Sequence, residues 1–341
     1  MPEDISKQRV FAMSDFSKTL DSIRRDFNEL QETLNRVIVG QETLIAEILI
    51  AIFAGGHVLL EGLPGLGKTH IAKAVAAVLG LNLGRVQCTP DLLPADITGS
   101  EILVGESSRI EFRPGPVFAH LLLVDEINRA TPRTQAALLE AMQEQQVTYA
   151  GVRHPLPQPF RVIATQNPIE LEGTFPLPEA QLDRFLFKIN VSYPSAESLD
   201  QLLDTSLDSE PADELTTLIT KDRTIEIQHA ARQILLAKPV KKAAIDMVLG
   251  TQPESESAAQ VARNHIRYGA SPRALQSLVR AARVRAMFAG RAQVDFEDLE
   301  AIALPVLSHR ILLATHSELE GVTVPAVLHE LLREWRSVHR K

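Results

Sequence analysis

Short apolar runs alternate with amphipathic stretches over residues 35–193. Each run is brief and holds few polar residues, which is typical of strands buried on both faces of a sheet. The stretches between them, such as 69–79 and 134–143, repeat apolar residues at helical spacing and supply crossovers. The pattern therefore predicts an α/β fold with a parallel sheet between helices. Its expected strands are 57–60, 85–88, 121–124, 161–165 and 187–191.

Two segments interrupt this alternation, and a change of composition follows it. Residues 100–115 and 146–160, the second turning near Ala150-Gly151, read as hairpins. The chain becomes acidic and polar after Pro194, and from about residue 228 it looks helical throughout. We expect four parts: a helical lead-in at 1–34, an α/β core at 35–194 with both hairpins, an acidic linker or helical insert at 195–228, and a smaller all-helical domain at 229–341.

Charge and cysteine content narrow the classes of function. The chain has 35 Lys and Arg against 43 Asp and Glu, a net charge of −8, which argues against a broad nucleic-acid surface. Cys88 is the only cysteine, so a disulfide within the chain and a cysteine metal site are excluded. No secretory signal is evident, and the longest apolar stretch, 48–54, is shorter than the ~20 residues of a membrane span. We expect a soluble cytoplasmic protein with no membrane span.

The strongest chemical signal is a glycine-rich segment between an expected strand and helix. Its sequence, Gly-Leu-Pro-Gly-Leu-Gly-Lys-Thr at 62–69, matches the G-x-x-x-x-G-K-[ST] phosphate-binding loop. Glycines let backbone N–H groups approach phosphate oxygens, and the helix amino terminus attracts the anion. Lys68 is expected on the β- and γ-phosphates and the Thr69 hydroxyl on Mg²⁺. The residues predicted to contact ATP here are Gly62, Pro64, Gly65, Leu66, Gly67, Lys68, Thr69 and His70.

An acidic pair follows the expected strand at 121–124. Asp125 at the strand tip is positioned to hold Mg²⁺ together with Thr69, and the adjacent Glu126 to polarise the attacking water. A strand-end Asp alone could be a helix cap, but the phosphate loop upstream favours the metal role. The pair predicts ATP hydrolysis, beyond nucleotide binding.

Three further polar residues are candidates for catalysis. Asn167, after the expected strand at 161–165, could orient the lytic water or form an Asn-Pro turn. Arg184 could reach the γ-phosphate of another molecule or make a surface salt bridge. Arg273 follows Ser271-Pro272, a cap and first-turn pair. It could sense the γ-phosphate or make a surface contact.

In this order the motifs resemble the MoxR family of AAA+ ATPases. They are the phosphate loop, Leu-Leu-Leu-Val-Asp-Glu-Ile-Asn-Arg-Ala from 121, Ala-Thr-Gln-Asn-Pro from 164, Leu-Pro-Glu-Ala-Gln-Leu-Asp-Arg-Phe from 177 and Gly-Ala-Ser-Pro-Arg-Ala from 269. The resemblance covers roughly residues 35–315, with no departure at a motif position, and leaves about 30 amino-terminal residues unmatched.

The resemblance implies more than the residues show by themselves. Family members form rings, usually hexamers, with each active site between neighbouring subunits. On that pattern Arg184 is the arginine finger for a neighbour, Arg273 is the sensor of the lid domain, and Val39, Gly40 and Gln41 lie near the adenine. Both hairpins would point to the ring's channel. The resemblance also implies a chaperone-like role in maturing metal-containing enzymes or remodelling complexes, often with a partner that carries a von Willebrand factor A domain.

Other functions of the same architecture stay open at this point. A nucleic-acid motor is disfavoured by the acidic charge and by hairpins poor in basic and aromatic residues. The motor subunit of a metal chelatase is a close architectural alternative. A nucleotide-gated scaffold that does not hydrolyse ATP is disfavoured by the intact Asp125-Glu126 pair.

Overall fold

The protein is described from a computed structural model that covers residues 3–104, 109–169, 173–204 and 215–340. Its elements fall into two compact units, residues 33–225 and residues 1–32 with 226–341, and each is described by itself. Over the described ranges, no helix combines the length and apolarity needed to cross a lipid bilayer. The domain boundaries expected from the sequence stay a prediction.

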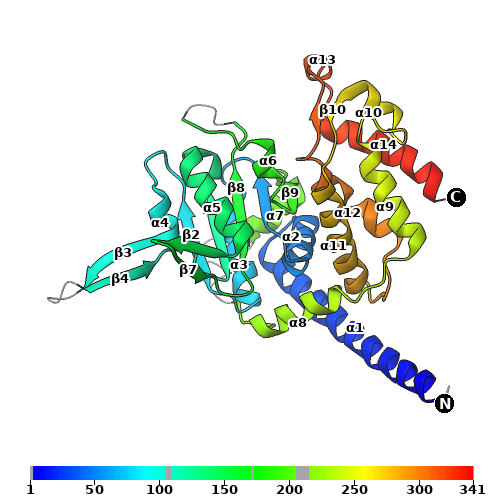
Figure 1. The fold of residues 1–341 in the computed structure, drawn as a ribbon, viewed down its shortest axis with the longest axis horizontal. Coiled ribbons are helices and arrows are strands. Elements are labelled where there is room, and N and C mark those ends of the chain that lie inside the picture. Colours follow the sequence, from blue (N-terminus) through cyan, green and yellow to red (C-terminus); the bar gives the residue numbers. More distant parts are fainter. Residues whose placement is uncertain (1–2, 105–108, 170–172, 205–214, 341) are drawn as a thin grey trace. The chain divides into compact units, whose positions relative to one another are not determined.

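A five-stranded parallel sheet forms the centre of the unit 33–225, as the apolar runs predict (Figure 1). The strand order is β2-β5-β8-β1-β9, so β8 lies between the strands that precede the phosphate loop and the acidic pair. Consecutive strands in this sheet therefore need crossovers, which the helices supply. The strands are β1 (Val58–Glu61), β2 (Leu83–Gln87), β5 (Leu121–Asp125), β8 (Arg161–Gln166) and β9 (Phe187–Asn190).

Helices flank this sheet and bury its apolar side chains. All five residues of β5 are buried, and α5 packs Leu138, Leu139 and Met142 into the same core as Leu122 and Val124. That helix begins with Thr131 at its cap and a proline in its first turn, which fixes its start. The helical elements are α2 (Glu42–Phe53), α3 (Lys68–Val78), α4 (Pro94–Thr98), η1 (Ile127–Arg129), α5 (Pro132–Glu144), α6 (Glu179–Leu182), α7 (Ala196–Asp204) and the first part of α8 (Lys221–Ala231).

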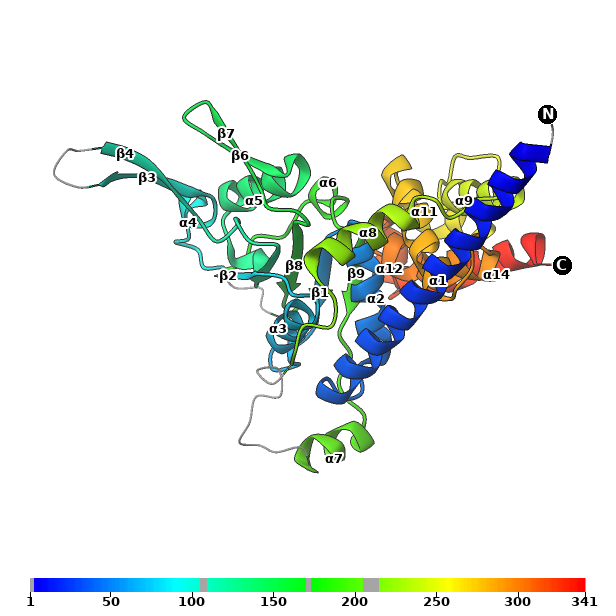
Figure 2. The same cartoon turned by 90° about the horizontal axis from the view of Figure 1, so that it is seen from below.

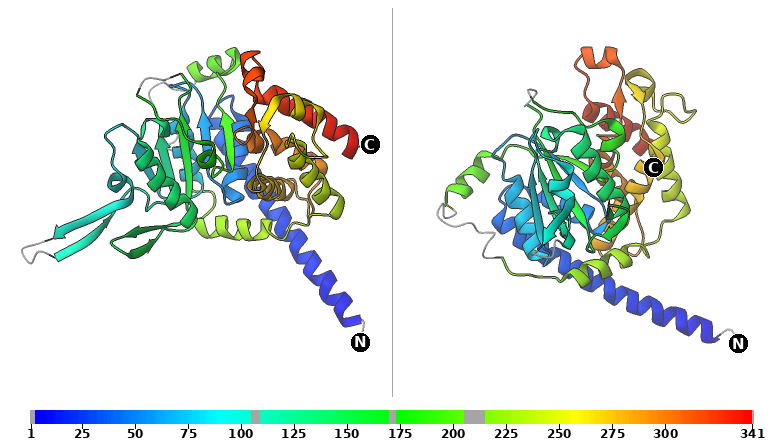
Figure 3. Two further views of the ribbon diagram at one scale, coloured as in Figure 1. Left: turned by 45° about the horizontal axis from the view of Figure 1, so that its top comes forward. Right: turned by 60° about the vertical axis from the view of Figure 1, so that its left-hand side comes forward.

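Both predicted hairpins are present and project beyond the sheet of their unit (Figures 1, 2 and 3). The first pairs β3 (Gly99–Val104) with β4 (Arg109–Pro114), and its turn at 105–108 lies outside the described residues. The second pairs β6 (Gln146–Tyr149) with β7 (Val152–Pro155) through Ala150 and Gly151, both with positive φ as a two-residue hairpin turn requires. The hairpins touch where the Phe112 ring stacks on His154, with centroids 4.1 Å apart.

The other unit is mainly helical, but one prediction about it is wrong. The sequence suggested only helices after residue 228, whereas β10 (Ile266–Tyr268) and β11 (Leu312–Leu313) form a small antiparallel ladder. Strands of two or three residues are too short to show a periodic pattern in the sequence. They pair because the tertiary structure brings them together, and not because of local strand propensity. The helices are α1 (Glu3–Val37), whose first part belongs here, α9 (Lys238–Gly250), α10 (Gln260–His265), α11 (Pro272–Phe288), α12 (Phe296–Leu307), α13 (Thr315–Leu319) and α14 (Val324–His339).

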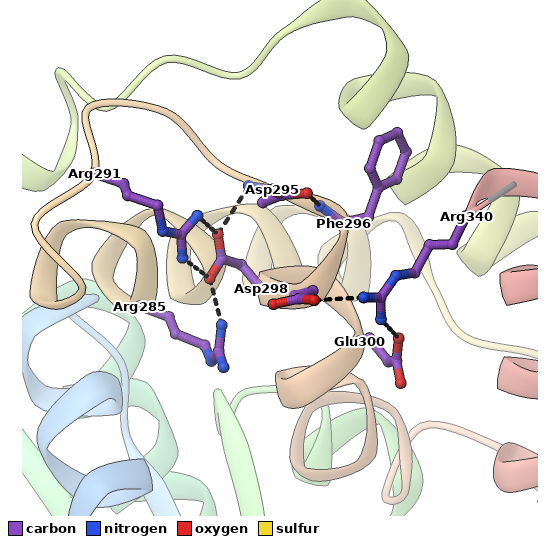
Figure 4. Close-up of polar contacts among 8 residues, drawn as sticks. Arg285, Arg291, Asp295, Phe296, Asp298, Glu300 and Arg340 are labelled. Carbon is purple, nitrogen blue, oxygen red and sulfur yellow. Dashed lines mark hydrogen bonds and ion pairs between the residues drawn. The ribbon is translucent and has the colours of Figure 1, made fainter.

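A buried carboxylate joins α11 to α12 in this unit. Asp298 has no exposed surface, and Figure 4 shows its two oxygens between Arg285 and Arg291. The Arg291 nitrogens lie 2.6 and 2.7 Å from those oxygens, and the Asp295 N–H, 2.8 Å away, donates to Oδ2 in a capping box. The hydrogen bonding to the Asp298 carboxylate raises the pKa of the Arg291 guanidinium. A buried charge is tolerated when it is paired and hydrogen-bonded in this way, so the network is structural.

Candidate functional site

The phosphate loop forms one wall of a cavity of about 610 Å³. It connects β1 to α3, and its Gly65 and Gly67 have φ values of +81° and +73°. A Cβ atom at either glycine would meet nothing within 4 Å, so the backbone here borders open space. The Lys68 ammonium donates to the Gly62 carbonyl at 2.6 Å, which holds the loop closed around its own turn. These features form a cradle for an anion at a helix amino terminus.

The acidic pair lines the same cavity. Asp125 is 6% exposed, and its Oδ1 lies 3.5 Å from the Thr69 hydroxyl. Two oxygens from separate elements thus face one point, as a shared magnesium ligand set requires. This meets the main structural expectation from the sequence, that the loop and the acids converge.

Glu126 adopts a backbone conformation that is unusual for a residue with a side chain. Its φ is 55°, in the left-handed region, which costs about 1–3 kcal/mol for a non-glycine residue. The Thr165 hydroxyl on β8 accepts a hydrogen bond from the Glu126 N–H at 2.9 Å and thereby fixes this conformation. Its carboxylate accepts from Gln87 at 3.0 Å and from Arg129 at 3.2 Å. Glu126 is therefore held in one orientation at the cavity wall.

Asn167 lies at the tip of β8, beside both motifs, and is buried. Its Oδ1 accepts from the Ile169 N–H at 3.2 Å, which is the local turn considered from the sequence. The amide nitrogen is the atom of this side chain able to donate to a water in the cavity. The two interpretations of Asn167 are therefore compatible.

The cavity brings together most of the predicted residues and adds four that the sequence did not single out. Predicted residues lining it are Pro64, Gly65, Leu66, Gly67, Lys68, Thr69, His70, Asp125, Glu126 and Asn167. The additional residues are Lys73, Arg85, Gln87 and Thr165. Arg85 and Gln87 alternate along an expected strand, so the sequence shows that both side chains lie on the same face of it. The sequence does not show which carboxylates these side chains contact.

Several predicted residues do not line this cavity. Val39, Gly40 and Gln41 precede α2, and the buried Gln41 Oε1 has no hydrogen-bond partner among the described residues. Gly40 packs against α7, where an added Cβ would come within 2.1 Å of the Ser198 hydroxyl oxygen. Arg184 follows α6 and donates to the Leu139 carbonyl at 2.8 Å, away from the cavity of its own chain. Arg273 is exposed in the first turn of α11, in the other unit.

Cys88, which follows β2, lies beside the acidic pair but has no chemical role there. The residue is 1% exposed, and its N–H donates to the Asp125 carbonyl at 2.9 Å. Burial, and then the negative charges of Asp125 and Glu126, raise the pKa of the thiol to about 12. A thiol that stays protonated at neutral pH is a poor nucleophile, which excludes cysteine catalysis at this site.

Comparison with known proteins agrees with this geometry. A model of the ATPase family associated with various cellular activities (AAA) matches residues 57–187, and a model of the AAA lid domain matches residues 258–331. The first match contains the phosphate loop, the acidic pair, Asn167 and Arg184, while the second contains Arg273.

Curated relatives and a solved structure match over most of the chain. The chain is 40% identical to the uncharacterised protein YeaC of Bacillus subtilis, over 88% of this chain and 91% of that one. It is 39% identical to the chaperone MoxR1 of Mycobacterium tuberculosis (88% and 79%) and 34% identical to protein MoxR of Methylorubrum extorquens (83% and 86%). A crystal structure of a candidate ATPase from Cytophaga hutchinsonii superposes with a TM-score of 0.86 at 36% identity, covering 95% of this chain and 98% of that one.

Proposed function

Starting from the fact that this chain belongs to the MoxR family of AAA+ ATPases, we propose that it uses Mg²⁺-dependent ATP hydrolysis to remodel or mature protein complexes, metal-containing enzymes among them. One observation carries the nucleotide part: the glycine-rich loop and the acidic pair line one cavity, and Thr69 and Asp125, 56 residues apart in the sequence, lie 3.5 Å from each other there. The name of the 39% identical relative, a chaperone, supports the remodelling part.

The residues present fit ATP and magnesium. The open positions beside Gly65 and Gly67 leave room for phosphate oxygens, and Lys68 supplies a cation at the same place. Thr69 and Asp125 offer the hydroxyl and carboxylate oxygens that Mg²⁺ prefers. Bound magnesium would neutralise charge on the transferred phosphoryl group.

Glu126 and Asn167 are proposed to act on the attacking water. Glu126 is the general base that takes a proton from the attacking water, because its carboxylate is held at the cavity wall by Gln87 and Arg129. Asn167 orients that water through its amide nitrogen. Gln41, whose buried Oε1 lacks a partner among the described residues, fits an adenine amino group, with Val39 and Gly40 beside it.

We further propose that the protein acts as a ring, with six subunits, and that sites are shared between neighbours. Arg184 does not line the cavity of its own chain, which fits a role as an arginine finger for another subunit. Arg273 is proposed as the sensor arginine contributed by the helical unit. A von Willebrand factor A domain protein is the proposed partner, acting with a protein client, and a cytoplasmic location stays a prediction from the sequence.

A mixing experiment tests whether Arg184 acts on a neighbour. We expect Arg184→Ala and Glu126→Gln to be inactive separately and to regain activity when mixed in equal amounts. In a mixed ring about a quarter of the sites join an intact Glu126 to an intact Arg184, so up to about a quarter of normal turnover should return. The measurement is phosphate release, with ring assembly followed by light scattering. Intact assembly without any regained turnover would remove Arg184 from the neighbour's site.

A capture experiment tests the remodelling role. We expect Glu126→Gln, loaded with ATP, to retain a client and a partner protein from a lysate, since it binds nucleotide without turning it over. The matched control is the double variant Lys68→Ala/Glu126→Gln, which lacks nucleotide and should release the same proteins. If no protein is retained in an ATP-dependent way, and single-stranded DNA instead stimulates hydrolysis at low salt, the protein is a nucleic-acid motor.

A further inference from the structure

The carboxylate of Asp125 makes one contact that ATP hydrolysis does not require. Arg85, on β2, donates through Nε to the Asp125 Oδ2 at 2.9 Å, while Oδ1 faces the Thr69 hydroxyl. The two partners differ in exposure: the side chain of Asp125 is 8% exposed, and that of Arg85 is 54% exposed. A cation with access to solvent therefore neutralises a buried carboxylate at the proposed metal site.

Arg85 and a magnesium ion compete for the same charge. A buried carboxylate needs a positive partner, because leaving it unpaired away from water is costly. The guanidinium has donors only, so it cannot ligate a metal, and it repels a divalent cation placed beside it. Lys68 already adds positive charge to this cavity. Either Arg85 or Mg²⁺ can neutralise Asp125. The triphosphate adds negative charge to the cavity, but two cations beside the same carboxylate still repel each other over the short distance between its two oxygens.

The position of the Arg85 side chain allows its guanidinium to move away from Asp125. Strand β2 lies at the edge of the five-stranded sheet and, among the described residues, pairs with β5 alone. Its Arg85 side chain lines the cavity and is 54% exposed. Arginine carries a long, rotatable stem, so it can move without a change in the strand. Asp125, by contrast, is fixed in the buried strand β5.

We propose that Arg85 is a displaceable counter-ion of Asp125, a positioning residue that holds the carboxylate in place until the magnesium-bound nucleotide arrives. The proposal rests on the proposed function, because it concerns the same cavity. Binding of the metal then breaks the ion pair between Arg85 and Asp125, and the guanidinium moves to the solvent side of the cavity. The free energy of that ion pair is lost when magnesium binds, so the pair weakens the binding of the magnesium-bound nucleotide. It does not weaken the binding of nucleotide without metal.

A binding experiment measures how much the ion pair between Arg85 and Asp125 weakens magnesium binding. The probe is mant-labelled adenylyl imidodiphosphate, which resists hydrolysis, titrated into the full-length protein with excess Mg²⁺ or with EDTA. The quantity of interest is the ratio of the two dissociation constants, without and with magnesium. We expect Arg85→Gln to raise this ratio about two- to fivefold, the range expected for losing a partly exposed ion pair. The metal-free probe carries more negative charge than its magnesium complex, so a general loss of attraction for phosphate would also raise the ratio. The dissociation constant measured with magnesium separates the two cases: it falls in Arg85→Gln only if the ion pair opposes the metal, and a constant that does not fall overturns the proposal.

Two further variants keep the result interpretable. Arg85→Lys keeps the positive charge and should leave the ratio close to that of the unmodified protein, and Arg133→Gln, an exposed arginine on α5, should do the same. Thermal unfolding shows that each variant is folded. An unchanged ratio in Arg85→Gln means that the ion pair persists with metal bound, and a reduced ratio means that Arg85 helps to hold the metal complex; either result overturns the proposal. Failure of the unmodified protein to bind the probe at all would instead contradict the proposed function.

Discussion

Replacement of Lys68 by alanine is expected to weaken ATP binding by at least about 100-fold, which corresponds to ~3 kcal/mol of charge-assisted hydrogen bonding to phosphate. The Lys68 ammonium lines the cavity and donates to the Gly62 carbonyl at 2.6 Å. The substitution therefore removes both the charge that meets the phosphates and a contact that closes the loop. Isothermal titration calorimetry with Mg²⁺-ATP measures the loss of affinity.

A matched lysine separates this local effect from a general loss of charge. Lys221→Ala removes an exposed lysine at the start of α8 and should leave ATP affinity unchanged. Circular dichroism of Lys68→Ala should show a folded protein, because Lys68 is only partly buried. Near-normal ATP affinity in a folded Lys68→Ala protein would mean that the glycine-rich segment does not bind phosphate.

The second large effect is expected for Glu126→Gln, which should bind ATP with near-normal affinity but lose about 100- to 10,000-fold in turnover, the usual contribution of a general base. Glutamine keeps the shape of the side chain and can still accept from Gln87, so the geometry of the cavity wall is retained. What is lost is the ability to take a proton from water. Steady-state phosphate release gives kcat, and equilibrium binding gives the affinity.

The control for this substitution is another Glu→Gln change in the same unit. Glu140 is exposed on α5 and does not line the nucleotide cavity, so Glu140→Gln should keep full turnover. If Glu126→Gln also turns over ATP at the normal rate, the base must be sought elsewhere in the cavity. The outcome separates hydrolysis from binding, because Lys68→Ala should affect binding and Glu126→Gln should not.

Much of the nucleotide site follows from local sequence signals. The phosphate loop, the buried strand that ends at Asp125 and the Asn167 turn each depend on residues within about ten positions of one another. Glycines that permit positive φ, runs of buried apolar residues and caps at helix starts act over such distances. The same signals predicted the parallel strands, both hairpins and the proline-initiated helix α11. The orientation of Glu126 was not predictable in this way, since it depends on Thr165 from another strand.

The contacts around the acids were decided by tertiary structure alone. Arg85 and Gln87 meet Asp125 and Glu126 because β2 pairs with β5, strands whose order in the sheet no local pattern encodes. The β10–β11 ladder and the stacking of Phe112 on His154 have the same origin. In each case partners that are 39–47 residues apart in the sequence meet only after the chain has packed. The sequence by itself determined which groups could carry the chemistry, because propensities and motifs are local. Only the fold determined which charges neutralise one another, because ion pairing depends on distance in space and not along the chain.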